Sequence, residues 1–304
     1  MSLHWQHLPN AAPEAADVLI QPLPFEATAC FVKGTARAPE AILAAADQLE
    51  YYEEDLGWSP MQWLRPCVLP PLAPSPEEVI AEYLHRIGQT VRGLPDNALY
   101  IGLGGEHSLT PPQVEARMHS GTIVVIDAHA DLRDQYQGSP YSHACPMRRL
   151  HEAGYRLELI GVRSLYEGEA AYLQQHPDIG LWRDRALREP RQWQALLERL
   201  QGLEGPVWLS IDMDGLDPAL VPGVGTPQPG GLDWFQTLAI IETLLDNPQV
   251  DLRGVDLVEL IPDPHQVSQT VAAKLVQKII SRWAWPRVDR NGTPTGAQTE
   301  IAYE

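Results

Sequence analysis

The segment VVIDAHADLRD, residues 124–134, indicates both the class of fold and the place of a site. Apolar residues 123–126 lead directly into Asp127, His129 and Asp131, which are potential metal ligands at alternate positions. An unbroken apolar run is typical of a strand buried on both faces, as in a parallel sheet. Side chains at alternate strand positions point the same way. We therefore expect a central parallel strand whose carboxyl end presents three polar groups to one place.

Short apolar runs of this kind recur along the chain and alternate with helical patterns. The expected strands cover residues 17–23, 67–70, 98–104, 122–128, 157–162, 180–182, 207–214 and 254–260. The expected helices cover residues 38–56, 75–91, 189–201, 232–246 and 268–283. This alternation predicts an α/β fold with three layers, α/β/α, around a parallel sheet of about eight strands. We interpret residues 1–304 as one domain with a core over about 22–283, the Pro-rich stretch 69–78 as a surface loop, and 286–304 as a mobile tail or an arm that rests on a neighbour.

Composition narrows the partners and the surroundings of the chain. Its 304 residues include 22 Lys plus Arg and 40 Asp plus Glu, which gives a formal charge of −18. This charge opposes contact with phosphate backbones, so no nucleic-acid partner is expected. Cys30, Cys67 and Cys145 lie far apart without CxxC spacing, which argues against a disulfide framework and a cysteine zinc site. No segment has the ~18 apolar residues of a membrane span, and no signal peptide is evident. We expect a soluble, cytoplasmic protein.

Two further strand ends carry residues that commonly bind metals. His107 follows the expected strand 98–104, and Asp212 and Asp214 close the expected strand 207–214. Parallel neighbours place their carboxyl ends side by side, and sites in open α/β sheets collect there. We therefore expect these three residues to converge with the three of segment 124–134, although they lie over a hundred residues apart.

The charge of this set predicts its occupant. Four carboxylates crowded into apolar surroundings would repel one another, and each buried charge would cost several kcal/mol unless cations neutralised it. Two divalent ions balance four carboxylates. Two imidazoles and four carboxylates without a thiolate suit Mn²⁺, with Fe²⁺, Co²⁺, Ni²⁺ or Zn²⁺ as alternatives. Two such ions, roughly 3.5–4 Å apart, can bridge a water and form hydroxide near neutral pH, which predicts metal-assisted hydrolysis.

Each motif has a simpler explanation when it is taken alone. A D-x-D pair at a strand end can be a turn or a cap, and His107 can be a hydrogen-bonded structural imidazole. The run GGEH can be a tight turn, and it lacks the Gly spacing and the Lys of a phosphate-binding loop. Because all three motifs follow buried strands, a common site is the better interpretation.

Four segments resemble the signature segments of the ureohydrolase family, in the same order: GLGGEHSLT, IDAHADLRD, SIDMDGLDPALVPGVGTPQPGGL and GVDLVELIP. The segment GTARAPEAILAAADQLEYYEEDLG is also similar to the N-terminal region of the family, so the resemblance covers about residues 22–283. It implies an arginase-like fold with two Mn²⁺ per chain. In the implied roles, His107 and Asp131 bind one ion, His129 and Asp214 bind the other, Asp127 and Asp212 bridge both, Glu259 holds the substrate guanidinium, and His143 shuttles protons.

The resemblance also implies the reaction. A metal-bridging hydroxide attacks the guanidino carbon, Asp214 and His143 move a proton to the departing amine, and urea leaves. Residues 132–149 lack the pattern that holds the substrate α-carboxylate in arginases and are similar to agmatinases of bacteria and archaea. We therefore expect a small cationic guanidino substrate, agmatine, with putrescine and urea as products. Members of the family commonly form homotrimers or homohexamers, and the resemblance implies the same here.

Several alternatives stay open at this point. Gln228 stands where many agmatinase-like sequences have Glu, and guanidinobutyrate, guanidinopropionate, arginine and formimidoylglutamate are alternative substrates. Arg148 and Arg149 could bind a substrate carboxylate, although salt bridges at a helix start are the simpler interpretation. Cys145 could act as a nucleophile with His143 as its base. A zinc deacetylase-like enzyme and a non-catalytic polyamine-binding relative are further alternatives, and the complete set of six ligands argues against both.

Overall fold

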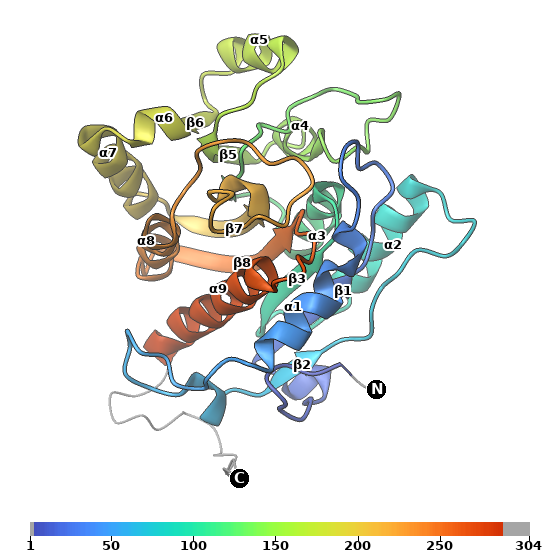
Figure 1. The fold of residues 1–304 in the computed structure, drawn as a ribbon, viewed down its shortest axis with the longest axis vertical. Helices are drawn as coiled ribbons and strands as arrows, with labels where there is room; N and C mark the ends of the chain where they lie inside the picture. Colours follow the sequence, from blue (N-terminus) through green and yellow to red (C-terminus); the bar gives the residue numbers. More distant parts are fainter. Residues whose placement is uncertain (1–2, 288–304) are drawn as a thin grey trace.

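A single parallel sheet of eight strands organises the protein, as a computed structural model of residues 3–287 shows (Figure 1). The strands lie in the order β2-β1-β3-β8-β7-β4-β5-β6, and every neighbouring pair is parallel. Their bounds are β1 Val18–Leu23, β2 Pro66–Val68, β3 Leu99–Gly104, β4 Thr122–Ile126, β5 Arg156–Val162, β6 Gly180–Arg183, β7 Gly205–Asp212 and β8 Val250–Val258. The predicted tail over 286–304 lies outside the described residues from position 288 onward.

Helices cover both faces of the sheet, which confirms the predicted three-layer α/β/α architecture. On one face lie α1 Ala38–Ala46, α6 Asp184–Leu187, α7 Pro190–Gln201, α8 Trp234–Leu245 and α9 Val267–Ala284. On the other face lie α2 Ile80–Arg92, α3 Thr110–Arg117, α4 Pro146–Glu152 and α5 Glu167–Gln175. Figure 1 shows α9 and α1 crossing in front of the strands, with α2 and α3 behind them.

Strand β4 shows why the apolar runs are unbroken. Val124 and Ile126 belong to the core cluster on the α9 side, whereas Ile123 and Val125 belong to the cluster on the α2 side. All four side chains are buried. A strand between two helical layers needs apolar residues at every position, because both of its faces are removed from water. The prediction of a central parallel strand is confirmed. The strand ends at Ile126, however, so Asp127, His129 and Asp131 lie in the loop that follows it and not at alternate strand positions.

Several expected helices differ from the observed ones. The helix expected over 38–56 ends at Ala46, and the Asp47 carboxylate accepts a hydrogen bond from the His7 backbone instead of facing solvent. Helices α3, α4, α5 and α6 were not expected. Helix α3 was missed because its first turn contains two prolines, which are also common in loops. Helices α4, α5 and α6 were missed because each is at most nine residues long. The stretch 69–78 contains no helix or strand, which confirms its interpretation as a loop. The strand expected over 67–70 accordingly ends at Val68, and the helix expected over 75–91 begins at Ile80.

The topology brings four strand ends together. Strands β3, β8, β7 and β4 are consecutive in the centre of the sheet, although they come from distant parts of the chain. Their carboxyl ends point to the same edge because all four strands are parallel. The expected metal ligands lie at or after the ends of β3, β4 and β7, and Glu259 follows β8, so the sheet order sets the position of the candidate site.

Within residues 3–287, none of the helices has the length and apolar character that crossing a membrane requires.

Candidate metal centre

Tight turns bring the polar groups at the ends of β4 and β7 into contact. Asp212 ends β7, and Asp214 lies in the 3₁₀ turn Met213–Gly215 that follows it. A Cβ atom at Gly215 would lie 2.7 Å from the amide nitrogen of Asp127. Only glycine therefore fits where the turn after β7 passes the end of β4.

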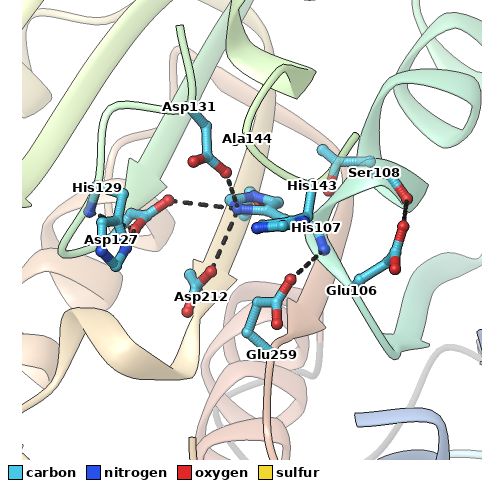
Figure 2. A network of polar contacts seen from close by, with 12 residues as sticks. Glu106, His107, Ser108, Asp127, His129, Asp131, His143, Ala144, Asp212 and Glu259 are labelled. Atoms are coloured by element: carbon cyan, nitrogen blue, oxygen red, sulfur yellow. Dashed lines mark hydrogen bonds and ion pairs between the residues drawn. The ribbon is translucent and has the colours of Figure 1, made fainter. Parts of the chain in front are cut away.

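His107 lies at the centre of the cluster and is fully buried. Its Nδ1 atom is 3.3 Å from Asp127 Oδ2, 3.1 Å from Asp131 Oδ2 and 3.3 Å from Asp212 Oδ2. Figure 2 shows the three carboxylates converging on this imidazole. Asp131 adopts a φ of 50°, which is uncommon for a residue with a Cβ atom. The structure thus places one imidazole nitrogen among three carboxylates.

Asp127 faces a second imidazole as well as the first. Its Oδ1 atom lies 3.6 Å from His129 Nδ1, while Oδ2 faces His107. Asp214 Oδ2 lies 3.1 Å from the same His129 nitrogen. The ligand atoms form two groups, each within 4.8 Å: His107, Asp127 and Asp212, and Asp127, His129 and Asp214. A carboxylate shared by two groups in this way is suited to bridge two cations.

A buried hydrogen-bond chain behind His107 was not anticipated. His107 Nε2 lies 3.0 Å from Ser210 Oγ, and Ser210 donates in turn to Asp256 Oδ1 at 2.6 Å. Trp208 Nε1 and Thr110 Oγ1 also donate to the Asp256 carboxylate. If His107 Nε2 carries the proton, this chain leaves the Nδ1 lone pair facing the three carboxylates, as a metal ligand requires. The sequence does contain a signal for this chain, because Ser210 and Asp256 are polar residues inside apolar strands. The two residues are paired neighbours on β7 and β8.

The side chains fit divalent cations because two buried ligand atoms face each other at 3.3 Å without forming a hydrogen bond within the described part of the chain. Among residues 3–287, neither His107 Nδ1 nor Asp127 Oδ2 has a hydrogen-bond partner. An unsatisfied buried polar atom costs roughly 1–3 kcal/mol. A cation between an imidazole nitrogen and carboxylate oxygens removes this cost and neutralises the carboxylates.

The pKa values show the same need for positive charge. Burial alone would lower the pKa of His129, but Asp127 and Asp214 outweigh it and raise the pKa to about 12. Burial, followed by the Asp127 carboxylate, raises the pKa of Asp131 to about 7. Burial and the Asp214 carboxylate likewise raise the pKa of Asp212 well above its usual value. Without cations, the cluster therefore holds protons that cations would displace.

Cation binding should weaken as the pH falls. A cation needs the unprotonated Nδ1 of His129, whereas the raised pKa keeps that imidazole protonated through the neutral range. Each displaced proton makes the apparent affinity about tenfold stronger per pH unit of increase. Titration of the metal-free protein with Mn²⁺ between pH 6 and 8, by calorimetry in buffers of different ionisation enthalpy, should show this slope and proton release. A Kd that does not change with pH would contradict a site built on these imidazoles.

Beside the cluster lies a cavity of about 180 Å³. Its lining includes His143 and Glu259, the two substrate-side residues expected from the sequence. Glu259 accepts a hydrogen bond from the His107 backbone amide at 2.7 Å, and its φ of 62° is again left-handed. Burial and the nearby Glu106 carboxylate raise the pKa of Glu259 well above its usual value. Within the described chain, Glu259 forms no salt bridge with Lys or Arg, so a cationic ligand would stabilise its charged form.

His143 is held in the cavity wall by a residue from the N-terminal part of the chain. Its backbone amide donates to Thr28 Oγ1 at 2.9 Å, and its Nδ1 atom lies 3.0 Å from the same oxygen. Burial and the positive neighbours His107 and His129 lower the pKa of His143 to about 4. His143 is therefore neutral near pH 7, and its Nε2 atom is the nitrogen not engaged by Thr28.

Glu106 fixes Thr28 and was not identified from the sequence. Its carboxylate accepts hydrogen bonds from the Ala27 and Thr28 amides, both at 2.7 Å, and from Thr28 Oγ1 at 2.9 Å. Ser108 Oγ also donates to it at 2.7 Å (Figure 2). Glu106 immediately precedes His107, so one turn positions both a ligand and, through Thr28, the wall that carries His143. No local spacing signalled the partnership, because Thr28 and Glu106 are 78 positions apart.

The structure decides between several of the alternative interpretations. Cys145 is fully buried, and burial raises the pKa of its thiol to about 11, which contradicts a role as a nucleophile. Arg148 pairs with Glu152, and Arg149 pairs with Asp134 and Glu152, so the interpretation as helix-start salt bridges is confirmed. Gln228 contributes its backbone carbonyl oxygen, which accepts hydrogen bonds from the Arg163 guanidinium.

Comparison with known proteins agrees with this geometry. Residues 16–281 match the model of the arginase family. The chain is similar to N(1)-aminopropylagmatine ureohydrolase of Synechocystis, with 38% identity over 88% of this chain and 89% of the relative. It is also similar to agmatinase of Pyrococcus horikoshii, with 35% identity over 90% of this chain and 94% of the relative. The crystal structure of agmatine ureohydrolase of Thermoplasma volcanium superposes with a TM-score of 0.79 at 28% identity, covering 91% and 93% of the two chains.

Proposed function

Because this chain belongs to the arginase family, we propose that it hydrolyses the guanidino group of an agmatine-type polyamine and releases urea. The observation that carries the proposal is the shared position of Asp127 between two imidazole–carboxylate groups. They lie next to a cavity lined by Glu259, which has no Lys or Arg partner among residues 3–287. N(1)-aminopropylagmatine is the first substrate to test, and agmatine is the second, because the relatives from Synechocystis and Pyrococcus carry these names. The amine products would be the aminopropyl derivative of putrescine and putrescine itself.

Two Mn²⁺ per chain are the proposed cofactors. His107 and Asp131 would hold one ion, His129 and Asp214 the other, and Asp127 and Asp212 would contact both. Two imidazoles with four carboxylates form a hard to borderline donor set, which suits Mn²⁺ better than a soft metal. When bound, the two cations lower the pKa of water and so supply the nucleophile for hydrolysis.

The remaining steps belong to side chains of this protein. Glu259 would bind the substrate guanidinium, since its carboxylate is buried and lines the cavity without a Lys or Arg partner among the described residues. His143 would accept and pass on a proton at Nε2, because Thr28 engages Nδ1 and the imidazole is neutral. Asp214 would assist the same proton transfer from the other side of the cluster. Thr226 Oγ1 donates a hydrogen bond to its carboxylate at 3.1 Å.

One observation favours a second class of substrate. Arg133 lines the same cavity, and its guanidinium lies 4.8 Å from the Tyr136 ring centroid and 4.3 Å from that of Tyr166. Among residues 3–287, Arg133 has no salt bridge to a carboxylate. An unpaired guanidinium could hold the carboxylate of a guanidino acid such as guanidinobutyrate.

A substrate panel with an Arg133→Gln variant separates the two classes. Protein loaded with Mn²⁺ would be offered N(1)-aminopropylagmatine, agmatine, guanidinobutyrate and arginine, and urea would be measured. We expect the highest kcat/KM with one of the two polyamines. Arg133→Gln should leave that value unchanged or raise it a fewfold, because a like charge is removed. Rapid urea release from guanidinobutyrate that falls more than tenfold in Arg133→Gln would replace the polyamine proposal with the acid one.

Replacing His143 should slow the reaction without emptying the metal site. Removal of a positioned proton-transfer group reduces the rate by roughly 10²–10⁴-fold. For His143→Ala we expect kcat to fall about a hundredfold while the Mn²⁺ content stays at the wild-type value. His265→Ala, at an exposed histidine, is the matched control and should keep full activity. An unchanged kcat in His143→Ala would remove this residue from the mechanism.

Assembly as a homotrimer or homohexamer in the cytoplasm completes the proposal, on the resemblance noted from the sequence. Sedimentation equilibrium of the purified protein gives the number of subunits directly.

A further inference from the structure

A second group of potential metal ligands lies away from the cavity. His151 belongs to α4, and His176 and Asp178 lie in the connection between α5 and β6. Each residue offers one ligand atom, and the three atoms lie within 4.8 Å of one another. None of the three lines the cavity beside the cluster of His107. Figure 1 shows that α4 and α5 both lie at the β5–β6 side of the sheet.

The histidine at the centre of this group is already oriented. His151 Nδ1 lies 2.6 Å from the hydroxyl of Tyr172, so Nε2 is the nitrogen that faces Asp178 Oδ2 at 3.1 Å. The side chain of His151 is only 11% exposed, whereas that of Asp178 is 68% exposed. The His176 ring packs against both rings, with centroids 4.9 Å from His151 and 4.1 Å from Tyr172. A hydrogen-bonded inner imidazole and an open carboxylate are what a metal site accessible from solvent needs.

We propose that His151, His176 and Asp178 bind a divalent cation of the Zn²⁺ type. Zn²⁺ prefers nitrogen and oxygen ligands in a tetrahedron, with bonds of roughly 2.0–2.2 Å, and accepts water in a fourth position. The three ligand atoms, which lie within 4.8 Å of one another, would have to approach further, through the half-buried His176 and the exposed Asp178 side chains. The nearby guanidinium of Arg148 is paired with Glu152 at 2.7 Å, which limits its repulsion of a cation.

A cation here would join two elements that hold the wall of the cavity. The α4 amides of Met147 and Arg148 donate to the Asp131 carbonyl oxygen at 3.1 and 3.2 Å. From α5, the Glu169 carboxylate accepts a hydrogen bond from the Leu132 amide at 2.9 Å. Both helices therefore anchor the start of residues 132–145, the segment that carries His143. Fixing α4 to the end of α5 should reduce local opening of this segment.

Equilibrium dialysis of the intact protein against Zn²⁺ tests the site. Mn²⁺ is kept saturating, and both metals are counted per chain by elemental analysis. We expect wild type to hold one zinc more than His176→Ala or Asp178→Asn, with equal Mn²⁺ content in all three. His119→Ala, at an exposed histidine elsewhere, should behave as wild type. Equal zinc in wild type and both variants would overturn the proposal, whatever the central cluster binds.

Hydrogen exchange checks the consequence of binding. Zn²⁺ should slow amide exchange in residues 132–145 at least severalfold in wild type and leave exchange unchanged in His176→Ala. Zinc that binds at the three residues without slowing this exchange would refute the link to the cavity wall.

Discussion

Asp127→Asn is expected to lose bound Mn²⁺ and urea release together while the fold is retained. The new amide oxygen can still accept the His129 backbone hydrogen bond that Oδ1 accepts at 2.6 Å. The amide nitrogen, however, would replace Oδ2, which faces His107 and has no hydrogen-bond partner among the described residues. The substitution thus removes one negative charge shared by both ligand groups and removes the Oδ2 ligand atom from the His107 group. Loss of the metal-supplied nucleophile should cost about 4 kcal/mol or more, about a thousandfold in rate.

The measurements are metal content by elemental analysis and kcat with the best polyamine. Asp251→Asn is the matched control, because Asp251 lies exposed near the amino end of β8, far from the cluster, in a surface ion pair with Arg253. Both variants should unfold with a cooperative thermal transition. Full metal content and activity in Asp127→Asn would show that Asp127 is not a shared ligand.

Glu259→Gln is expected to impair substrate binding but not metal binding. The amide oxygen of glutamine can keep the hydrogen bond from the His107 amide, so the turn after β8 should survive. The substitution removes the buried carboxylate charge that would pair with the substrate guanidinium. Truncating one partner of a buried charged pair costs roughly 2–5 kcal/mol, so kcat/KM should fall about thirtyfold or more.

Steady-state kinetics across the substrate panel, with Mn²⁺ counted in the same samples, provides the test. Glu82→Gln, at an exposed position of α2, is the matched control and should not change kcat/KM. A variant with wild-type kcat/KM for the best substrate would mean that another group holds the guanidinium.

The sheet and its ligands were accessible from the sequence for physical reasons. Burial on both faces forces unbroken apolar runs, and Ile123 to Ile126 show this in β4, where alternate residues enter opposite cores. The ligands were found because they follow the carboxyl ends of buried parallel strands. The expected alternation along a strand was wrong, since β4 ends at Ile126 and Asp131 adopts a φ of 50°. The predicted fold and the family resemblance are confirmed, whereas the roles of individual ligands stay predictions.

Features set by distant contacts were not accessible in this way. In the sequence, the helical pattern runs over residues 38–56. In the structure, the helix ends at Ala46, and the Asp47 carboxylate accepts a hydrogen bond from the His7 backbone amide. The support of His143 by Thr28 and Glu106 depends on backbone amides that carry no sequence signal. No local sequence pattern indicated that Arg133 lines the cavity, because only the folded loop places its guanidinium beside the rings of Tyr136 and Tyr166.

Product analysis with N(1)-aminopropylagmatine and agmatine tests the central claim most directly. Protein loaded with Mn²⁺ is predicted to release one urea for each amine product from at least one of these substrates, and no ammonia. Release of ammonia without urea from both substrates, or acetate from an acetylated polyamine with one zinc bound per chain, would contradict the proposed hydrolysis of the guanidino group.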